Sequence, residues 1–281
     1  MFATELKLSK KLLPIETTAL TVAYHRALES VRPDRLFEDP FAALFVAIAG
    51  DAALSAAKLL FASTDYFAIR TRFFDDFLSK SCRSGCRQVV LLASGLDARA
   101  FRLPFPAGVR LFEVELQTML LFKESVLSIA RARPRCDRHL VSADLRNDWQ
   151  SSLVQAGFRD VPTVWLIEGL LYFLTNEDTD RLLRDITELS PSGSAIGFDH
   201  VNEATLQAIA PIADGMARRG VGWRSAVEHP APWLRDLGWT ASVHPHGQVA
   251  ERYGRPFEQL DCPAGIEPVT WLVEARRSGQ T

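Results

Sequence analysis

The stretch Gln88-Val-Val-Leu-Leu-Ala-Ser-Gly-Leu-Asp97 predicts how this chain folds. Five of its first six residues are apolar, and the sequence then turns small at Ala93, Ser94 and Gly95. A short run rich in Val and Leu, bounded by Gly, is typical of a buried strand in a parallel sheet. Glycine tolerates positive φ and has no Cβ, so the loop can approach a ligand closely. Because ligands of open α/β sheets bind beyond the carboxyl ends of the strands, this loop is a candidate ligand site.

An acid follows the next strand candidate, residues 109–114, at a spacing typical of nucleotide-binding sheets. Glu115 lies 20 residues after Gly95, and such sheets place their ribose ligand about 20 residues past the glycine-rich turn. A carboxylate has two acceptor oxygens, enough for both ribose hydroxyls. Glu113 lies one strand period earlier, inside the predicted strand. We therefore expect Glu115, and not Glu113, to bind a ribose.

The loop lacks the glycines that bind phosphate groups. A dinucleotide site needs G-x-G-x-x-G, whereas here Gly95 is followed by Leu96, Asp97 and Ala98. Asp97 would put a negative charge beside any phosphate, and the sequence contains no G-x-x-x-x-G-K-[ST] motif. A nucleoside without phosphates suits this loop better. We expect S-adenosyl-L-methionine as the cofactor, with S-adenosyl-L-homocysteine as its product.

Six short motifs in this order resemble those of one known family: Thr18–Ala27, Leu36–Pro40, Ile69–Asp76, Ser94–Leu103, Phe112–Glu115 and Glu168–Leu171. On these motifs the chain resembles the leucine carboxyl methyltransferase superfamily, in particular its bacterial small-molecule branch, which includes polyketide O-methyltransferases. Three positions depart from the family pattern, which usually has a second small residue, often Gly, at Ala93, Asp at Glu115 and Tyr at Phe173.

Strand and helix patterns alternate from residue 88 onward, which predicts a parallel sheet. With the resemblance, this predicts an α/β fold of the Rossmann-like class I methyltransferase type, with a mostly parallel seven-stranded sheet and helices on both faces. The strand candidates are residues 88–93, 109–114, 139–143, 162–167, 194–199, 240–244 and 269–275, and the helix candidates among them are about 116–132, 148–156 and 176–190.

Residues 1–85 are predicted to be a helical cover, and residues 86–281 the methyltransferase domain. Helices are expected at about 18–31, 41–48 and 65–78. In the family this segment covers the cofactor and supplies one basic residue to it. An insertion at about 202–228 is expected to form a lid over the substrate, as in related methyltransferases, and it contains Met216, Arg218, Arg219, Gly220, Gly222 and Trp223.

The resemblance and the strand ends together suggest a partner for most parts of the cofactor. Arg70 is expected to pair with its carboxylate, with Arg72 as the alternative, and Glu168 to receive its ammonium group. Asp144 would accept from the adenine amine, while the backbone N–H of Leu145 donates to a ring nitrogen. The complete expected cofactor set is Arg70, Ala93, Ser94, Gly95, Glu115, Leu116, Asp144, Leu145 and Glu168.

The expected reaction is methyl ester formation on a carboxylate of a small molecule or peptide. A carboxylate is already ionised at neutral pH, since its reference pKa is near 4, and it needs no general base. A phenol or alcohol acceptor is the alternative and would need a base such as His200; a non-catalytic binding module is a third possibility. The residues expected to line the substrate site are Tyr24, Arg26, Tyr172 and His200, and Arg26 is expected to bind the substrate carboxylate. Asp97, Arg99 and Arg102 are expected to form a structural ion-pair cluster.

Composition narrows the class of protein further. The 281 residues suit one large α/β domain, and the net charge of -2 gives no electrostatic case for nucleic acid. No run of 18 apolar residues predicts a membrane span, and the N-terminus lacks a signal-peptide pattern.

Four cysteines form no dense framework, which favours a reducing cytoplasm. Cys82 and Cys86 could be half of a metal site, but no close second pair completes it, so no metal is expected. The sequence predicts neither the oligomeric state nor the methyl acceptor.

Overall fold

The structure is a computed structural model that describes residues 14–51, 54–55, 64–209, 222–256 and 267–279. Within these ranges a seven-stranded sheet has the order β3-β2-β1-β4-β5-β7-β6. The strands are β1 (Gln88–Leu92), β2 (Arg110–Glu115), β3 (Asp137–Ser142), β4 (Thr163–Ile167), β5 (Ala195–Val201), β6 (Trp239–Pro245) and β7 (Thr270–Arg277). Strand β7 is antiparallel to β5 and β6, and the other neighbours are parallel. The predicted α/β class and mostly parallel sheet are confirmed.

The centre of the sheet is the pair β1 and β4, in which every residue is buried. The chain order reverses between these two strands, and ligands of open α/β sheets bind at such a switch point. Leu91 pairs with Leu166 in register, so the loop after β1 and the residue after β4 meet at the same edge. This position is the one that the opening stretch predicted for a ligand site.

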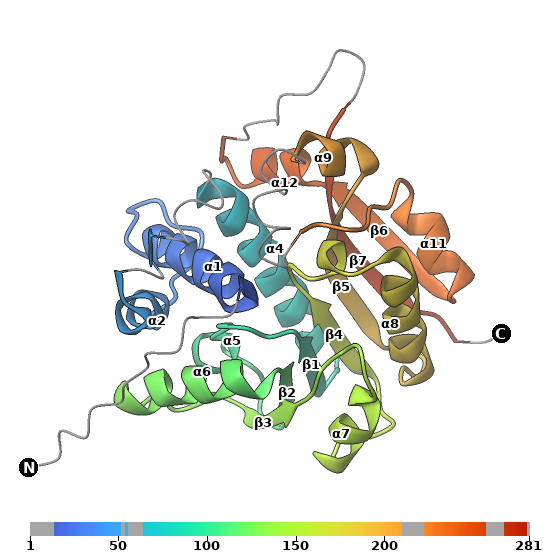
Figure 1. The fold of residues 1–281 in the computed structure, drawn as a ribbon. Helices are drawn as coiled ribbons and strands as arrows, with labels where there is room; N and C mark the ends of the chain where they lie inside the picture. Colours follow the sequence, from blue (N-terminus) through green and yellow to red (C-terminus); the bar gives the residue numbers. More distant parts are fainter. Residues whose placement is uncertain (1–13, 52–53, 56–63, 210–221, 257–266, 280–281) are drawn as a thin grey trace, which may run out of the picture.

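Helices cover both faces of the sheet (Figure 1). One core cluster joins the sheet to α4 (Thr64–Arg83), α6 (Gln117–Ile129) and α12 (His246–Arg252), and the other joins it to α7 (Trp149–Gln155), α8 (Asn176–Glu188) and α11 (Pro230–Asp236). Shorter elements lie between these helices and strands: α5 (Arg99–Arg102), the 3₁₀ helix η1 (Leu171–Phe173) and α9 (Glu203–Ala208).

The N-terminal helices α1 (Pro14–Ser30), α2 (Ala42–Ala49) and α4 lie together on one side of the sheet (Figure 1). Helix α4 buries Phe74, Phe77 and Leu78. It packs closely on β5 at Gly197, where an added Cβ would lie 2.7 Å from Cε1 of Phe77. Glycine at this position therefore lets α4 approach the sheet, and α4 carries its own polar residue Arg70 to the edge where β4 ends.

Candidate active site

A pocket lies at the carboxyl ends of β1, β2 and β4, beneath α1 and α4. The loop after β1 and the residues after β2 and β4 form one part of its wall. Arg26 of α1 and Arg70 of α4 contribute the guanidinium groups. Several aromatic side chains also contribute: Tyr66, Phe67, Tyr172, Phe173 and Trp223.

The loop after β1 turns sharply beside this pocket. Ala93 and Gly95 have positive φ angles of 50° and 47°, and a Cβ added at Gly95 would lie 3.4 Å from Cβ of Ala19 on α1. Ser94 is buried, and its Oγ has no hydrogen-bond partner among the residues that the structure describes. Buried hydroxyls are normally satisfied, so this Oγ is suited to a polar group of a ligand.

Glu115 connects the ends of the first two strands. Its Oε2 accepts from the backbone N–H of Gly95 at 2.8 Å, and its Oε1 accepts from that of Leu116 at 2.7 Å. Burial raises the pKa of Glu115, and the two N–H groups oppose that rise. Glu113 is buried elsewhere, where Lys123 and Arg138 donate to it. Glu115, and not Glu113, therefore lines the pocket, while its binding of a ribose stays a prediction.

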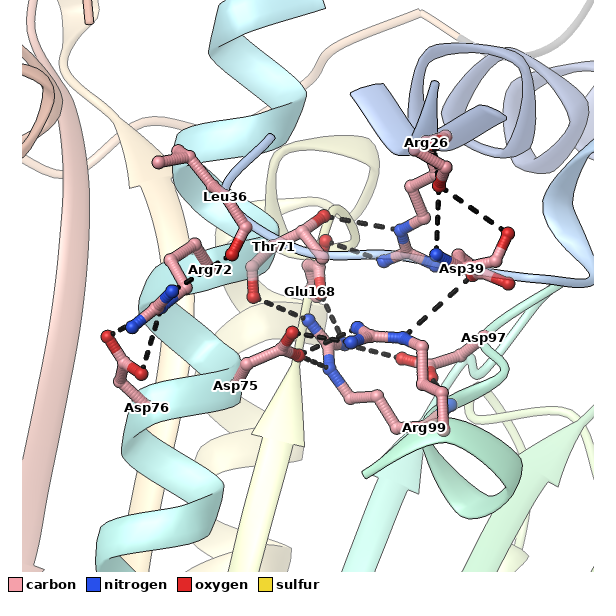
Figure 2. Close-up of polar contacts among 12 residues, drawn as sticks. Arg26, Leu36, Asp39, Thr71, Arg72, Asp75, Asp76, Asp97, Arg99 and Glu168 are labelled. Carbon is pink, nitrogen blue, oxygen red and sulfur yellow. Dashed lines mark hydrogen bonds and ion pairs between the residues drawn. The ribbon is translucent and has the colours of Figure 1, made fainter. Parts of the chain in front are cut away.

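Glu168, directly after β4, accepts hydrogen bonds from three arginines, of which Figure 2 labels Arg26 and Arg99. Its Oε1 lies 3.0 Å from Nη2 of Arg26 and 3.1 Å from Nε of Arg70, and its Oε2 lies 2.6 Å from Nη1 of Arg99. Burial alone would raise the pKa of Glu168, but these guanidiniums hold it well below its usual range. The sequence suggested that Glu168 receives the ammonium group of the cofactor. In this structure its oxygens already accept from three guanidinium groups, and a carboxylate shared by three cations would attract a fourth only weakly.

The ion-pair network extends from Arg99 to the helices (Figure 2). Arg99 also donates to Asp97 and Asp75, and Arg102 donates to both oxygens of Asp75. The predicted cluster of Asp97, Arg99 and Arg102 is present, but Arg102 reaches it through Asp75 on α4. The sequence did not reveal this link because the partners are far apart in the chain.

Arg70 is almost completely buried and has three hydrogen-bond partners. Its Nε donates to Glu168, and its Nη1 donates to the hydroxyl of Tyr172 at 3.1 Å and to Oδ2 of Asp199 at 3.0 Å. Its guanidinium also faces Tyr66, whose ring centroid lies 5.6 Å from Cζ of Arg70. The alternative, Arg72, lies outside the pocket and pairs with Asp76 at the surface.

The expected lid is described only in part. Residues 210–221, with Met216, Arg218, Arg219 and Gly220, lie outside the described residues. Trp223 lies 4.2 Å from Tyr172 between ring centroids and lines the pocket. The backbone N–H of Arg224 donates to the carbonyl of Tyr172, and the hydroxyl of Ser225 donates to that of Leu171. These bonds hold Trp223 against η1.

Four expected ligand residues are not among those lining the pocket: Asp144, Leu145, Tyr24 and His200. Asp144 pairs with Arg146 near the surface, and that guanidinium lowers the pKa of Asp144. Leu145 packs against the second core cluster. Tyr24 lies two residues after the pocket residue Val22, which places it roughly 200° around the helix. Tyr24 therefore does not face the pocket in this structure, and its contact with a substrate stays a prediction.

The position expected for His200, after the end of the fifth strand, is corrected by the structure. Strand β5 continues to Val201, so His200 lies within the strand and not after it. Its side chain points away from that of Asp199, since neighbouring residues in a strand face opposite sides, and it does not line the pocket. Its Nδ1 accepts from the backbone N–H of Val201 at 2.9 Å. Burial lowers the pKa of His200 to about 4.

The sequence reasoning missed Asp199 and the aromatic residues Tyr66 and Phe67. One signal could have indicated Asp199: it lies near the carboxyl end of β5, as Glu168 lies just after β4, and the carboxyl ends of parallel neighbours share an edge of the sheet. The aromatic pair precedes Arg70 by three and four residues, which is the spacing of one helix face.

No helix among the described residues is long and apolar enough to cross a membrane. The described ranges also contain no group of three His, Cys, Asp or Glu residues that could hold a metal ion.

Known proteins share both the sequence and the fold. A protein from Parafrankia, provisionally named an S-adenosyl-L-methionine-dependent methyltransferase, is 43% identical over 93% of this chain and 86% of its own length. One with the same provisional name from Streptomyces coelicolor is 40% identical, over 89% of this chain and 93% of its own. Two solved structures share the fold. One is from Thermobifida fusca and is provisionally named a methyltransferase; it has a TM-score of 0.61 and 14% identity, and the match covers 97% of each chain. The other is a DUF574 family protein from Streptomyces avermitilis; it has a TM-score of 0.60 and 15% identity, and the match covers 94% of this chain and 99% of that one.

The family comparison covers the part of the chain that forms the pocket. The leucine carboxyl methyltransferase model matches residues 19–187, which include the loop after β1, Glu115, Arg70 and Glu168. The motifs that suggested this family from the sequence lie almost entirely within that range. The chain belongs to the leucine carboxyl methyltransferase family.

Proposed function

We propose that this protein transfers the methyl group of S-adenosylmethionine to a carboxylate of a small molecule or peptide, which gives a methyl ester. Dependence on S-adenosylmethionine follows from the family and from the names of its relatives. The proposal goes beyond the family in naming a carboxylate as the methyl acceptor. The arrangement of the guanidinium groups in the pocket supports this choice of acceptor.

Two guanidinium groups line the pocket, and each has one amino group that the acids of the network do not engage. Arg26 donates to Thr71 and Glu168 through Nε and Nη2, which leaves Nη1. Arg70 uses Nε and Nη1, which leaves Nη2. Guanidinium N–H groups form strong charge-assisted bonds with carboxylates. A methyl transfer between an amino-acid cofactor and an acid brings two carboxylates into one site, and two such donors are available for them.

The residues present fit the cofactor. Ser94 has a buried hydroxyl without a partner in the described chain. Glu115 keeps further acceptor capacity on both oxygens, since each receives one backbone N–H. We assign Glu115 to the ribose and Arg70 to the methionine carboxylate. Gly95 would lie along the methionine part, where only glycine leaves enough room.

The chemistry that S-adenosylmethionine supplies is a methyl group on a sulfonium, open to in-line attack by an oxygen. The chain's own part is to position that oxygen and to exclude water. Arg26 would hold the acceptor carboxylate, as the sequence suggested. The rings of Tyr66, Tyr172 and Trp223 cover the pocket beside it. Tyr172 is itself fixed by Arg70, which donates to its hydroxyl.

Two acids and two tyrosines around the pocket have pKa values that are shifted away from neutral pH. Arginines hold the pKa values of Glu168 and Asp97 low against the effect of burial. Burial raises the pKa of Tyr66 to about 12 and that of Tyr172 well above its ordinary value. Groups in these states are poor general bases at pH 7, and an acceptor that is already ionised requires none.

The test is methyl transfer from S-adenosylmethionine labelled in the methyl group, with carboxylic acids and the matching phenols and alcohols as acceptors. Methyl esters release labelled methanol in mild alkali, whereas methyl ethers do not. We expect alkali-labile label with the acids. Label stable to alkali, formed only with phenols or alcohols, would refute the carboxylate assignment.

A pair of variants tests the guanidinium role. Arg26→Met should raise KM for the acid by about tenfold or more, because it removes a charge-assisted bond. Affinity for S-adenosylhomocysteine should change far less. The matched control is Arg72→Met, which removes an arginine outside the pocket and should leave both constants unchanged. Equal effects of the two variants would count against the assignment of Arg26.

A further inference from the structure

Two acids from neighbouring strands hold Arg70 from different sides. Its Nε lies 3.1 Å from Oε1 of Glu168 after β4, and its Nη1 lies 3.0 Å from Oδ2 of Asp199 in β5. Ile167 and Phe198 pair in register, so the two acids follow at adjacent positions of parallel strands. A planar guanidinium bonded through both Nε and Nη1 to separate strands has a fixed orientation.

Asp199 also fixes the turn beneath that guanidinium. It is completely buried, and its Oδ1 accepts from the backbone N–H of Gly169 at 2.6 Å. Gly169 has a φ of 73°, and a Cβ added there would lie 3.3 Å from both Nη1 and Nη2 of Arg70. Asp199 itself does not line the pocket. Its contacts therefore reach the pocket through Arg70 and Gly169.

The charges explain why a second acid is needed. Glu168 is shared among Arg26, Arg70 and Arg99, so it cannot neutralise Arg70 alone. Asp199 is the other anion bonded to Arg70 among the described residues. With Nε held by Glu168 and Nη1 by Asp199, Nη2 is the guanidinium nitrogen that neither acid engages.

We propose that Asp199 is a positioning residue that orients Arg70 toward the carboxylate in the methionine part of the cofactor. The proposal rests on the proposed function, in which Arg70 binds that carboxylate. It predicts that the loss of Asp199 weakens ligands that carry the amino-acid part and spares those that lack it.

The experiment compares the affinities of S-adenosylhomocysteine and 5′-methylthioadenosine, which keeps the nucleoside but has no carboxylate. In Asp199→Asn the amide nitrogen or oxygen replaces the anion beside Arg70. Affinity for S-adenosylhomocysteine should fall by about tenfold or more, as expected for a misplaced charge-assisted bond. Affinity for 5′-methylthioadenosine should stay within about twofold of the wild type, since the proposed ribose contact is to Glu115 and not to Arg70.

Two further variants complete the test. Asp75→Asn removes a buried carboxylate from Arg99 and Arg102 in the same network, and it should leave the ratio of the two affinities unchanged. Gly169→Ala displaces Arg70 while Asp199 stays intact, and it should lower the ratio as Asp199→Asn does. It also serves as the test if Asp199→Asn does not fold.

The outcomes separate the two proposals. A wild type that binds neither ligand refutes the proposed function and this inference with it. If the wild type binds S-adenosylhomocysteine but Asp199→Asn and Gly169→Ala leave the ratio unchanged, or Asp75→Asn lowers it equally, the inference about Asp199 alone is overturned.

Discussion

The backbone N–H of Gly95 donates a 2.8 Å hydrogen bond to Oε2 of Glu115, which joins the loop after β1 to the end of β2. The other oxygen of Glu115 accepts from Leu116. The carboxylate is therefore oriented before any ligand binds. Preorganised acceptors of this kind increase affinity because their own ordering does not have to occur on binding.

Glu115→Gln should weaken S-adenosylhomocysteine by at least about tenfold. The amide nitrogen would face a backbone N–H donor, and the charged acceptor for the ribose would be lost; hydrogen bonds to charged groups are worth about 1.5–3 kcal/mol. Calorimetric titration measures the effect. Glu113→Gln is the control, because Glu113 pairs with buried Lys123 and Arg138. It should lower Tm and leave the affinity of the folded protein within about twofold. A larger loss of affinity in the Glu113 variant would contradict the ribose assignment.

Ala93→Gly should stabilise the protein. Ala93 has a φ of 50°, and the left-handed conformation costs an L-residue roughly 1–2 kcal/mol. Glycine avoids that cost but loses about 0.5–1 kcal/mol more through chain entropy. The expected gain is up to about 1.5 kcal/mol, or a few degrees in Tm. Ala100→Gly, in the buried helix α5, should lower Tm instead. A lower Tm for Ala93→Gly would show that the loop is not strained at this residue.

Much of the fold was predictable because its signals are local. The runs of apolar residues gave all seven strands to within a few residues, and the spacing from Gly95 to Glu115 located two walls of the pocket. The end of β5 was misjudged because His200 and Val201 pair with Trp271 and Thr270 of an antiparallel neighbour, and no property of the two residues alone indicates that partner.

The polar network was less predictable because its contacts are distant in sequence. Arg26 and Glu168 are 142 residues apart, and Arg70 and Asp199 are 129 apart. The family motifs indicated Arg70 and Glu168 but not that they bond to each other. Only the packing of α1 and α4 over the strand ends brings these charges together.

Stability should fall as the pH is lowered from about 6.5 to about 4, partly because of buried histidines. Burial lowers the pKa of His200 and of His246 to about 4 from the ordinary value of 6.5. In this window the unfolded chain binds protons that the folded protein excludes, so each histidine contributes a slope of up to about 1.4 kcal/mol per pH unit. Above pH 6.5 both are neutral in either state, and this contribution to the slope disappears.

His200→Asn is the variant that tests this effect. The side-chain oxygen of Asn can accept the bond that Nδ1 receives from Val201, but it does not titrate. Urea unfolding at several pH values between 4 and 7 should show a free energy of unfolding that depends less on pH than in the wild type. The same pH dependence in both proteins would mean that His200 titrates normally in the folded state.

The pH dependence of methyl transfer tests the chemistry of the acceptor. With a carboxylate acceptor, whose pKa is near 4, single-turnover transfer at saturating cofactor and acid should be nearly flat from about pH 6 to 8.5. The groups around the pocket support this expectation, since the pKa of Glu168 is held low and that of Tyr66 is raised to about 12. His200 is buried away from the pocket, so His200→Ala should keep the rate within about tenfold, whereas loss of a general base costs on the order of 10²–10⁴. A rate that rises through a pKa between about 6 and 7.5, and loses that rise in His200→Ala, would overturn the carboxylate assignment and favour a hydroxyl acceptor.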